Sequence, residues 1–355
     1  MIYNYDVTLF SLEVFMEKKL FGIHEGKEIY LYTIKNESCS VDITNYGAAL
    51  VSFVPYGVDI VGGFDTLEKY IEDKSCQGVT VGRVCNRIEN AELHLDGAIY
   101  MLTVNDGDRG NCLHGGVGFK CRVWEIEDAT DNSVTLSYYS PDGEDGFPSA
   151  LYAKVTYTLE GADLIINYFA RPEGTTPIAL TNHAFFNLHG DFSRTIFDHT
   201  ARIYASSYTK VNEKLIPTGE HPAVAGTPFD FNEPHVIGSR LGEDLKSYDH
   251  NYILSPREHR VHFGKYLGLG AVVDNGNLEL SVYTDQPCVQ FYTAGFLGSG
   301  KFGDAPAFKG GVTPVRFGAF CLEAQTEPNC VNHGQAIYDA GQVYTQTTIY
   351  SVKKL

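Results

Sequence analysis

LYAKVTYTLEGADLIINYF, residues 151–169, is the stretch that decides the fold class. Apolar side chains occupy every second position from Leu151 to Leu159, and mostly polar ones stand between them. This period of two is that of a β-strand with one buried face. Residues 160–163 follow as a turn, and a second apolar run covers residues 164–169. The two runs are therefore predicted to form an antiparallel hairpin.

Strand-like segments continue on both sides of this hairpin. Residues 29–34 and 41–46 are rich in β-branched and aromatic side chains, and residues 270–284 contain DNGN, a strong hairpin signal. Helical patterns are confined to residues 66–71 and 237–245, and most of the 36 glycines punctuate the strand runs. We expect an all-β protein, a large antiparallel β-sandwich.

The length of 355 residues would allow about two domains, although large β-sandwiches also occur as one unit. No internal repeat, low-complexity linker or shift in composition divides the chain. We therefore expect one sandwich domain, with a division near residue 175 as the alternative.

Charge and cysteine content limit the partners and the compartment. The net charge of −17 opposes binding to nucleic acids or anionic membranes, because both require a basic surface. The eight cysteines include no C-x-x-C pair and no zinc spacing, so they indicate free thiols in a reducing cytoplasm. Acidic residues interrupt every apolar run in residues 1–21, and no later stretch reaches the ~18 apolar residues of a spanning helix.

Two polar clusters lie in the first third of the chain. GRVCNRI, residues 82–88, places two arginines and an asparagine in a nearly apolar run, which suits either a binding site or structural ion pairs. NCLHGG, residues 111–116, puts His114 before two glycines whose backbone is free to approach a ligand closely. A solvated loop histidine is the alternative at this position.

Two more clusters lie farther along the chain. TNHAFFNLHG, residues 181–190, crowds asparagines and histidines among phenylalanines, and His183 shares a face with Phe185 if the strand continues. AFCLEAQ, residues 319–325, places Glu323 on one strand face with Cys321 and Gln325. A core histidine and a salt-bridged glutamate are the alternatives, because buried polar groups need partners.

Other kinds of chemistry are less well represented. No G-x-S-x-G elbow, P-loop or H-E-x-x-H motif occurs, and EHRVH at 258–262 lacks the further ligand that a metal site needs. The acidic residues Asp142, Glu144 and Asp145 lie in a segment rich in glycine and proline that is typical of a turn. We expect no metal.

Eight motifs, taken in order, resemble the aldose 1-epimerase (galactose mutarotase) family. They are residues 82–88, 113–116, 140–146, 181–183, 187–190, YDHN at 248–251, VQFYT at 289–293 and CLEAQ at 321–325. The resemblance extends over nearly the whole chain from about residue 16. It implies one β-sandwich domain over residues 16–355, a sugar site, no cofactor, and a monomer or homodimer. Residues 1–15 match nothing in the family and are expected to be an extension or the result of an upstream start codon.

The resemblance also assigns roles to individual residues. Glu323 matches the general base on the anomeric hydroxyl, His183 the acid on the ring oxygen, and His114 a second histidine beside that oxygen. The groups that match those holding the sugar hydroxyls are Asn86, Arg87, Asp249 and Gln290. The expected function is interconversion of the α and β anomers of a free aldose such as galactose or glucose.

Two alternatives and two departures accompany this prediction. A hexose-6-phosphate 1-epimerase would need basic groups for the phosphate, with Arg83 as the nearest spare candidate, and a non-catalytic sugar-binding module is the other alternative. Thr293-Ala294-Gly295 stands where the family usually has Thr-Gly-Asn, and Pro328-Asn329-Cys330 where Pro-Asp-Ala is common. Both departures bear on substrate preference more than on catalysis.

Overall fold

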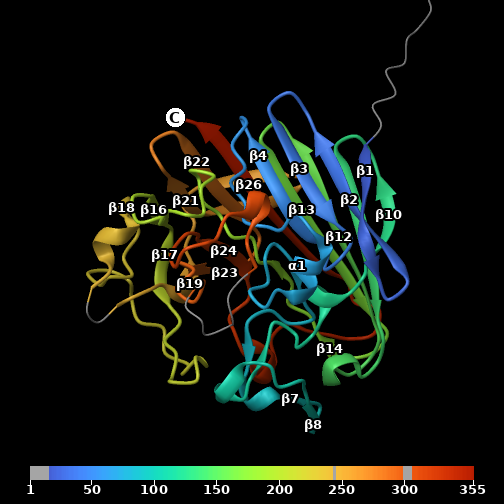
Figure 1. Ribbon diagram of the computed structural model, residues 1–355. Helices are drawn as coiled ribbons and strands as arrows, with labels where there is room; N and C mark the ends of the chain where they lie inside the picture. Colours follow the sequence, from blue (N-terminus) through green and yellow to red (C-terminus); the bar gives the residue numbers. More distant parts are fainter. Residues whose placement is uncertain (1–15, 243–244, 299–305) are drawn as a thin grey trace, which may run out of the picture.

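The computed structural model describes residues 16–242, 245–298 and 306–355, which are built mainly of antiparallel strands (Figure 1). The largest sheet has ten strands. In spatial order they are β10 (Glu125–Ala129), β11 (Ser133–Ser140), β12 (Leu151–Glu160), β13 (Asp163–Pro172), β26 (Tyr344–Lys354), β22 (Leu278–Thr284), β21 (Lys265–Asp274), β16 (Thr200–Ile203) and β18 (His235–Val236), with β20 (His259–His262) paired to β21.

Both hairpins predicted from the sequence are confirmed. In β12, every second residue from Leu151 to Leu159 is buried, and β12 pairs with β13 without a register shift up to Glu160 opposite Asp163. Strands β21 and β22 flank the predicted turn, where the Asn275 side chain accepts the backbone N–H groups of residues 277 and 278. The alternating pattern therefore located two interior strands of the largest sheet.

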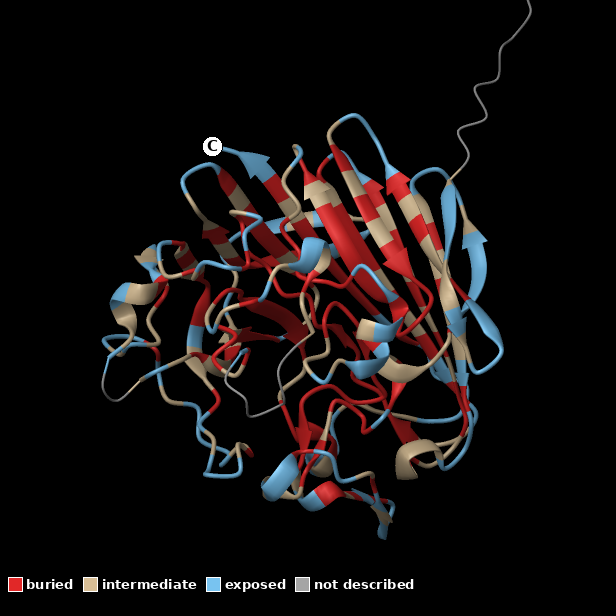
Figure 2. Ribbon diagram, in the orientation of Figure 1, coloured by how far each residue is buried: buried red, intermediate tan, exposed pale blue. Residues whose placement is uncertain are grey.

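Two four-stranded sheets pack with the large one. Their strands are β1 (Glu17–His24), β2 (Lys27–Lys35), β3 (Cys39–Thr44) and β4 (Ala49–Pro55), and then β17 (Ala205–Tyr208), β19 (Asp249–Leu254), β23 (Cys288–Tyr292) and β24 (Cys321–Gln325). Phe53, Val155 and Phe291, one from each of the three sheets, belong to one buried apolar cluster. Figure 2 shows buried residues along the strands of all three sheets.

Short strand pairs and single turns complete the fold. The pairs are β14 (Thr176–Pro177) with β25 (Ile337–Tyr338), β15 (Thr181–Asn182) with β5 (Thr80–Val81), β6 (Arg87–Ile88) with β9 (Cys112–Leu113), and β7 (Glu92–Leu95) with β8 (Ala98–Met101). Helix α1 (Leu67–Glu72) confirms the helical turn predicted near residue 66. Of residues 237–245, Ile237–Arg240 form a 3-10 turn, and residues 243–244 lie outside the described part.

The remaining 3-10 turns are η1 (Glu89–Ala91), η2 (Gly107–Arg109), η3 (Phe119–Cys121), η4 (Glu144–Gly146), η6 (Lys309–Gly311) and η7 (Cys330–His333). All eight cysteines lie within the described residues, and each is a free thiol. Among the residues that the structure describes, no helix has both the length and the apolar character needed to cross a membrane.

Strands on both sides of the alternative division near residue 175 share one sheet. Strand β13 ends at Pro172, and its partner β26 begins at Tyr344, with pairing from Asp163 opposite Ser351 to Ala170 opposite Tyr344. We therefore propose that residues 16–355 form one unit, as the sequence predicts. The expected extension, residues 1–15, lies outside the described residues.

One buried hydroxyl links the large sheet to the short strand β15. Tyr157 of β12 is fully buried and donates a hydrogen bond to the backbone oxygen of Ala48 over 2.7 Å. The same hydroxyl accepts the Nδ2–H of Asn182 over 3.3 Å. The side chain of Asn182, one residue before His183, is thereby fixed against β12 of the large sheet.

Arg83 ties the segment after β5 to the acidic turn. Its guanidinium donates hydrogen bonds to backbone oxygens of residues 140, 141, 148 and 149 and to the hydroxyls of Ser140 and Thr176. In that turn, Glu144 accepts a bond from Arg122, and Asp145 accepts the N–H groups of residues 117 and 118. These contacts agree with the structural interpretation of residues 142–145.

Replacing Arg83 by Lys is expected to lower the free energy of unfolding by about 3 kcal/mol, because several buried carbonyl groups lose their donor. Urea unfolding followed by fluorescence measures the loss. Arg257→Lys at an exposed position is the matched control and should change stability by less than about 0.5 kcal/mol. Equal stability of the two variants would contradict the role given to Arg83.

Candidate active site

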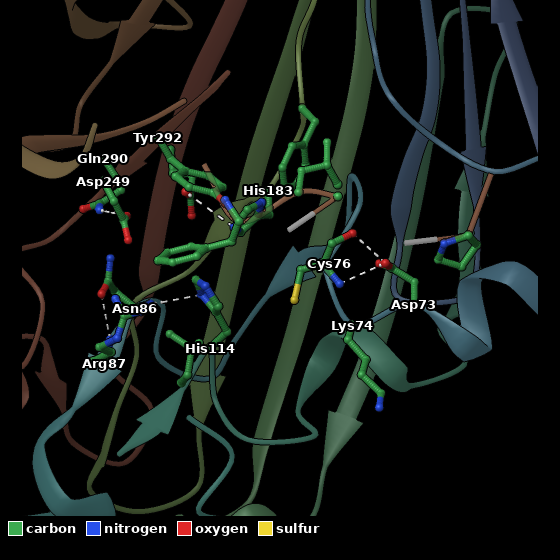
Figure 3. A pocket seen from close by; sticks show the side chains of 18 of the residues that line it. Asp73, Lys74, Cys76, Asn86, Arg87, His114, His183, Asp249, Gln290 and Tyr292 are labelled. Atoms are coloured by element: carbon green, nitrogen blue, oxygen red, sulfur yellow. Dashed lines mark hydrogen bonds and ion pairs between the residues drawn. The ribbon is translucent and has the colours of Figure 1, made fainter. Parts of the chain in front are cut away.

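All seven site residues predicted from the sequence line one cavity of about 250 Å³ (Figure 3). They come from six separate regions of the chain, and they are Asn86, Arg87, His114, His183, Asp249, Gln290 and Glu323. The fold therefore brings together groups that are up to about 240 residues apart in sequence.

Three adjacent strands position the acidic and amide groups. Asn251 of β19 lies directly opposite Gln290 of β23, and Gln290 lies directly opposite Glu323 of β24. Directly paired residues present their side chains on the same face of a sheet. Two positions earlier on β19, Asp249 lies opposite Tyr292, and the Gln290 side chain donates a hydrogen bond to Asp249 over 2.6 Å. The ladder thus fixes the relative positions of these groups.

The central feature of the cavity is a buried pair formed by His183 and Glu323. Their exposed fractions are 6% and 2%, and the His183 Nε2 atom lies 3.6 Å from the Glu323 Oε1 atom. Burial raises the pKa of Glu323 well above its usual range, and the charge of Asp249 raises it further, whereas Arg87 acts in the opposite direction. Burial also lowers the pKa of His183 to about 4. Both shifts favour the uncharged form of each group.

The segment that carries His183 differs from the continuous strand considered from the sequence. Strand β15 ends at Asn182, and residues 183–185 continue outside any regular strand. His183 and Phe185 nevertheless both line the cavity, and their rings stack with centroids 5.0 Å apart. His189 lies away from the cavity and contacts Asp198, which supports a structural role for it.

His114 is held in a single tautomer by the backbone. Its Nδ1 atom accepts the N–H of Asn86 over 3.2 Å, so the neutral ring carries its proton on Nε2. Burial lowers the pKa of His114 well below its usual range, and nearby His183 lowers it further. His114 therefore offers the cavity a hydrogen-bond donor.

This hydrogen bond also bears on metal binding. His114, His183 and Glu323 each have a potential ligand atom within 4.8 Å of the others. A metal-bound histidine must present a lone pair, but the lone pair of His114 already accepts the Asn86 N–H. The donor set of the three residues consequently fits a sugar oxygen better than a cation.

The glycines after His114 have a different role from the one expected. A side-chain carbon added at Gly115 would lie 2.1 Å from the backbone oxygen of Gly82, and one at Gly116 would lie 2.5 Å from Asp145. These glycines therefore permit close packing against protein rather than the close approach of a ligand. The expectation failed because the contact partners are distant in sequence.

Two further side chains on the cavity wall were not singled out from the sequence. Tyr292 could have been found, because strand alternation places it on the same face as Gln290. Cys76 lies in the loop between α1 and β5, and no local pattern identifies it. Its thiol points toward the cavity, whereas Lys74 extends away from the other labelled groups (Figure 3).

A family model described as aldose 1-epimerase matches residues 30–351. The chain belongs to the aldose 1-epimerase family. Galactose mutarotase from Bos taurus is 39% identical over 332 residues, covering 89% of this chain and 92% of that protein. Aldose 1-epimerase from Escherichia coli K12 is 32% identical, covering 92% and 96%.

Solved structures agree with this aldose 1-epimerase assignment. An aldose epimerase homologue from C. elegans has a TM-score of 0.81 at 28% identity, covering 92% of this chain and 99% of that one. Galactose 1-epimerase from Lactobacillus acidophilus has a TM-score of 0.82 at 23% identity, covering 96% and 99%, and supports the fold. The predicted family, the β-sandwich fold and an isomerase acting on carbohydrates are confirmed.

Replacing Gly115 by Ala is expected to displace His114 and to lower mutarotation of α-galactose by at least about tenfold, because the added carbon meets a backbone oxygen. Polarimetry measures the rate. Gly107→Ala is the control, since Gly107 also has a positive φ but its added carbon meets nothing within 4 Å. Equal losses in the two variants would mean that backbone strain alone explains the effect.

Proposed function

We propose that this aldose 1-epimerase interconverts the α and β anomers of a free aldose such as galactose or glucose, with Glu323 as general base and His183 as general acid. The observation that carries the proposal is the buried Glu323–His183 pair at 3.6 Å in a cavity lined by hydrogen-bonding groups. A purely structural role at this position would favour less polar side chains, because burying an unpaired carboxylate costs free energy.

Ring opening needs two proton transfers, one at each of the two oxygens bonded to the anomeric carbon. The Glu323 carboxylate takes the proton of the anomeric hydroxyl, the C1–O5 bond breaks, and O5 takes a proton from His183, which yields the open-chain aldehyde. After rotation about the C1–C2 bond, O5 attacks the other face of C1. O5 then returns its proton to His183, and Glu323 protonates the new anomeric oxygen. Protons and electrons balance, and both groups regain their starting states.

The two groups share one proton in the active enzyme. Burial favours protonated Glu323 with neutral His183, whereas catalysis starts from the Glu323 carboxylate with the His183 imidazolium. Both arrangements contain the same single proton, so the pair titrates as a unit. The short separation stabilises the charged arrangement by mutual attraction once the sugar completes the hydrogen bonding.

His114 supports O5 without supplying the proton. Because its Nε2 carries hydrogen in the neutral state, it can donate to the ring oxygen throughout the reaction. This divides the work between the histidines: His183 transfers the proton, and His114 stabilises the charge that develops on the oxygen.

The remaining cavity groups are proposed to hold the sugar hydroxyls. Among the described residues, the Glu323 Oε2 and Gln290 Oε1 atoms are buried without a hydrogen-bond partner, so each can accept from a substrate hydroxyl. Asp249 offers carboxylate oxygens beside Gln290, while Asn86 and Arg87 provide N–H donors on the other wall. Neutral hydroxyls need such mixed donors and acceptors.

Arg83, the candidate phosphate-binding residue of a hexose-6-phosphate 1-epimerase, is not available to a substrate. Arg83 is 2% exposed, does not line the cavity, and uses its guanidinium in hydrogen bonds to protein groups. The suggestion that Arg83 binds phosphate was therefore wrong, because the side chain turns into the protein to satisfy carbonyl groups. Comparing galactose, glucose and glucose 6-phosphate as substrates tests the preference for free aldoses.

Glu323→Gln should lower kcat for α-galactose by roughly 10²- to 10⁴-fold, the usual contribution of a positioned acid or base. The amide keeps the shape of the side chain but cannot accept a proton. NMR of anomer exchange measures the rate, and Glu213→Gln, an exposed site on the protein surface, serves as control. Turnover near that of the wild type would rule out Glu323 as base.

The pH dependence of kcat/KM should be bell-shaped. Activity is expected to fall below a pH of about 4, because protonation of His183 then gives the His183–Glu323 pair two protons and removes the base. It is expected to fall again above the raised pKa of Glu323, because the pair then loses its only shared proton and has no acid. Because the negative charge of Asp249 raises the pKa of Glu323, Asp249→Asn should move the alkaline limb to lower pH. An alkaline limb that stays in place would contradict this coupling.

A further inference from the structure

A carboxylate outside the cavity holds the side chain of Arg87 from behind. The Arg87 Nε donates a hydrogen bond to Asp106 Oδ2 over 3.0 Å, and the two side chains are 8% and 1% exposed. Arg87 lines the cavity, and Asp106 does not. Asp106 therefore acts on this wall of the cavity only through its neighbour.

Asp106 is itself held by further contacts at the same carboxylate oxygen. Its Oδ2 atom also accepts the Nδ2–H of Asn111 over 3.0 Å, and the Arg109 Nε lies 3.4 Å away. The loop is fastened by the Asn105 side chain, which exchanges hydrogen bonds with the backbone of Leu113 over 2.6 and 2.8 Å. The carboxylate is thus part of a rigid support that also carries β9, the strand before His114.

The geometry of a guanidinium makes this support directional. Its five N–H donors lie in one plane in a fixed fork, so anchoring Nε sets the plane in which the two Nη groups point. Within the described part of the chain, neither Nη of Arg87 has a hydrogen bond to protein. The anchored edge faces Asp106, and the free edge is left for a ligand in the cavity.

We propose that Asp106 is a positioning residue that aims the Nη groups of Arg87 at the sugar hydroxyls. The inference rests on the proposed role of Arg87 in holding substrate. A free arginine side chain would have to be ordered each time a sugar binds, whereas an anchored one is already ordered. Asp106 contributes by keeping the donor fork in its binding orientation.

A double-mutant cycle on kcat/KM for α-galactose tests this role. Asp106→Asn keeps the size of the side chain and removes its charge, and it should lower kcat/KM by at least about tenfold. In an Arg87→Gln background, Asp106→Asn should lower kcat/KM by less than about twofold, because no guanidinium remains to be oriented. Asp108→Asn, on the same loop but exposed, is the matched control and should leave kcat/KM unchanged.

Equal losses from Asp106→Asn in both backgrounds, or no loss in either, would overturn the inference, since a merely structural residue costs the same with or without Arg87. Should Asp106→Asn fail to fold, Asp106→Glu keeps the charge but displaces the fork by about 1 Å and should lower kcat/KM by ~10²-fold. Wild-type activity of Asp106→Glu would then overturn the inference. Wild-type activity of Arg87→Gln would instead refute the proposed role of Arg87 itself.

Discussion

The burial of one glutamate opposite one histidine is the constraint on which the rest of the site depends. Glu323 and His183 come from separate parts of the chain, and each is disfavoured as an ion where it lies. Such a pair persists only if the surrounding structure holds both members in place. Strand pairing holds Glu323 beside Gln290, and the Tyr157 hydroxyl holds the residue before His183. The four-stranded sheet that contains β23 and β24 therefore frames the cavity together with the large sheet.

The same short motif contains two arginines that differ in function because of their partners. All three nitrogens of the Arg83 guanidinium donate to protein, the two Nη groups to backbone carbonyl groups and Nε to the Ser140 hydroxyl, which makes Arg83 a structural tie. Arg87 is anchored at one nitrogen by a carboxylate, and its other nitrogens are available to the cavity. Arginine suits both tasks because its donors are numerous and fixed in direction. The two arginines therefore differ in whether protein groups accept all of their N–H donors, and not in their position in the motif.

Much of the fold was predictable because its signals are local. The alternation in β12 and the DNGN turn each depend on neighbours in sequence, and both hairpins were found. The face of Glu323 followed from the same alternation, and all seven expected site residues meet in one cavity. Their family-based roles remain proposals. What could not be predicted was contact between distant segments, such as Gly115 against Gly82 or Asp106 behind Arg87.

Strand β26 lies in the interior of the ten-stranded sheet, between β13 and β22. Its Tyr344 and Tyr350 side chains bond to backbone groups of Leu180 and Leu322, next to the segments that carry His183 and Glu323. During synthesis, strand β26 must therefore have emerged from the ribosome before the large sheet can close and the His183–Glu323 pair can form. Pairing over such distances in sequence is slow and leaves unpaired strand edges exposed in the meantime. Nascent chains of this protein should accordingly depend on protection from aggregation until residues 344–354 have left the exit tunnel.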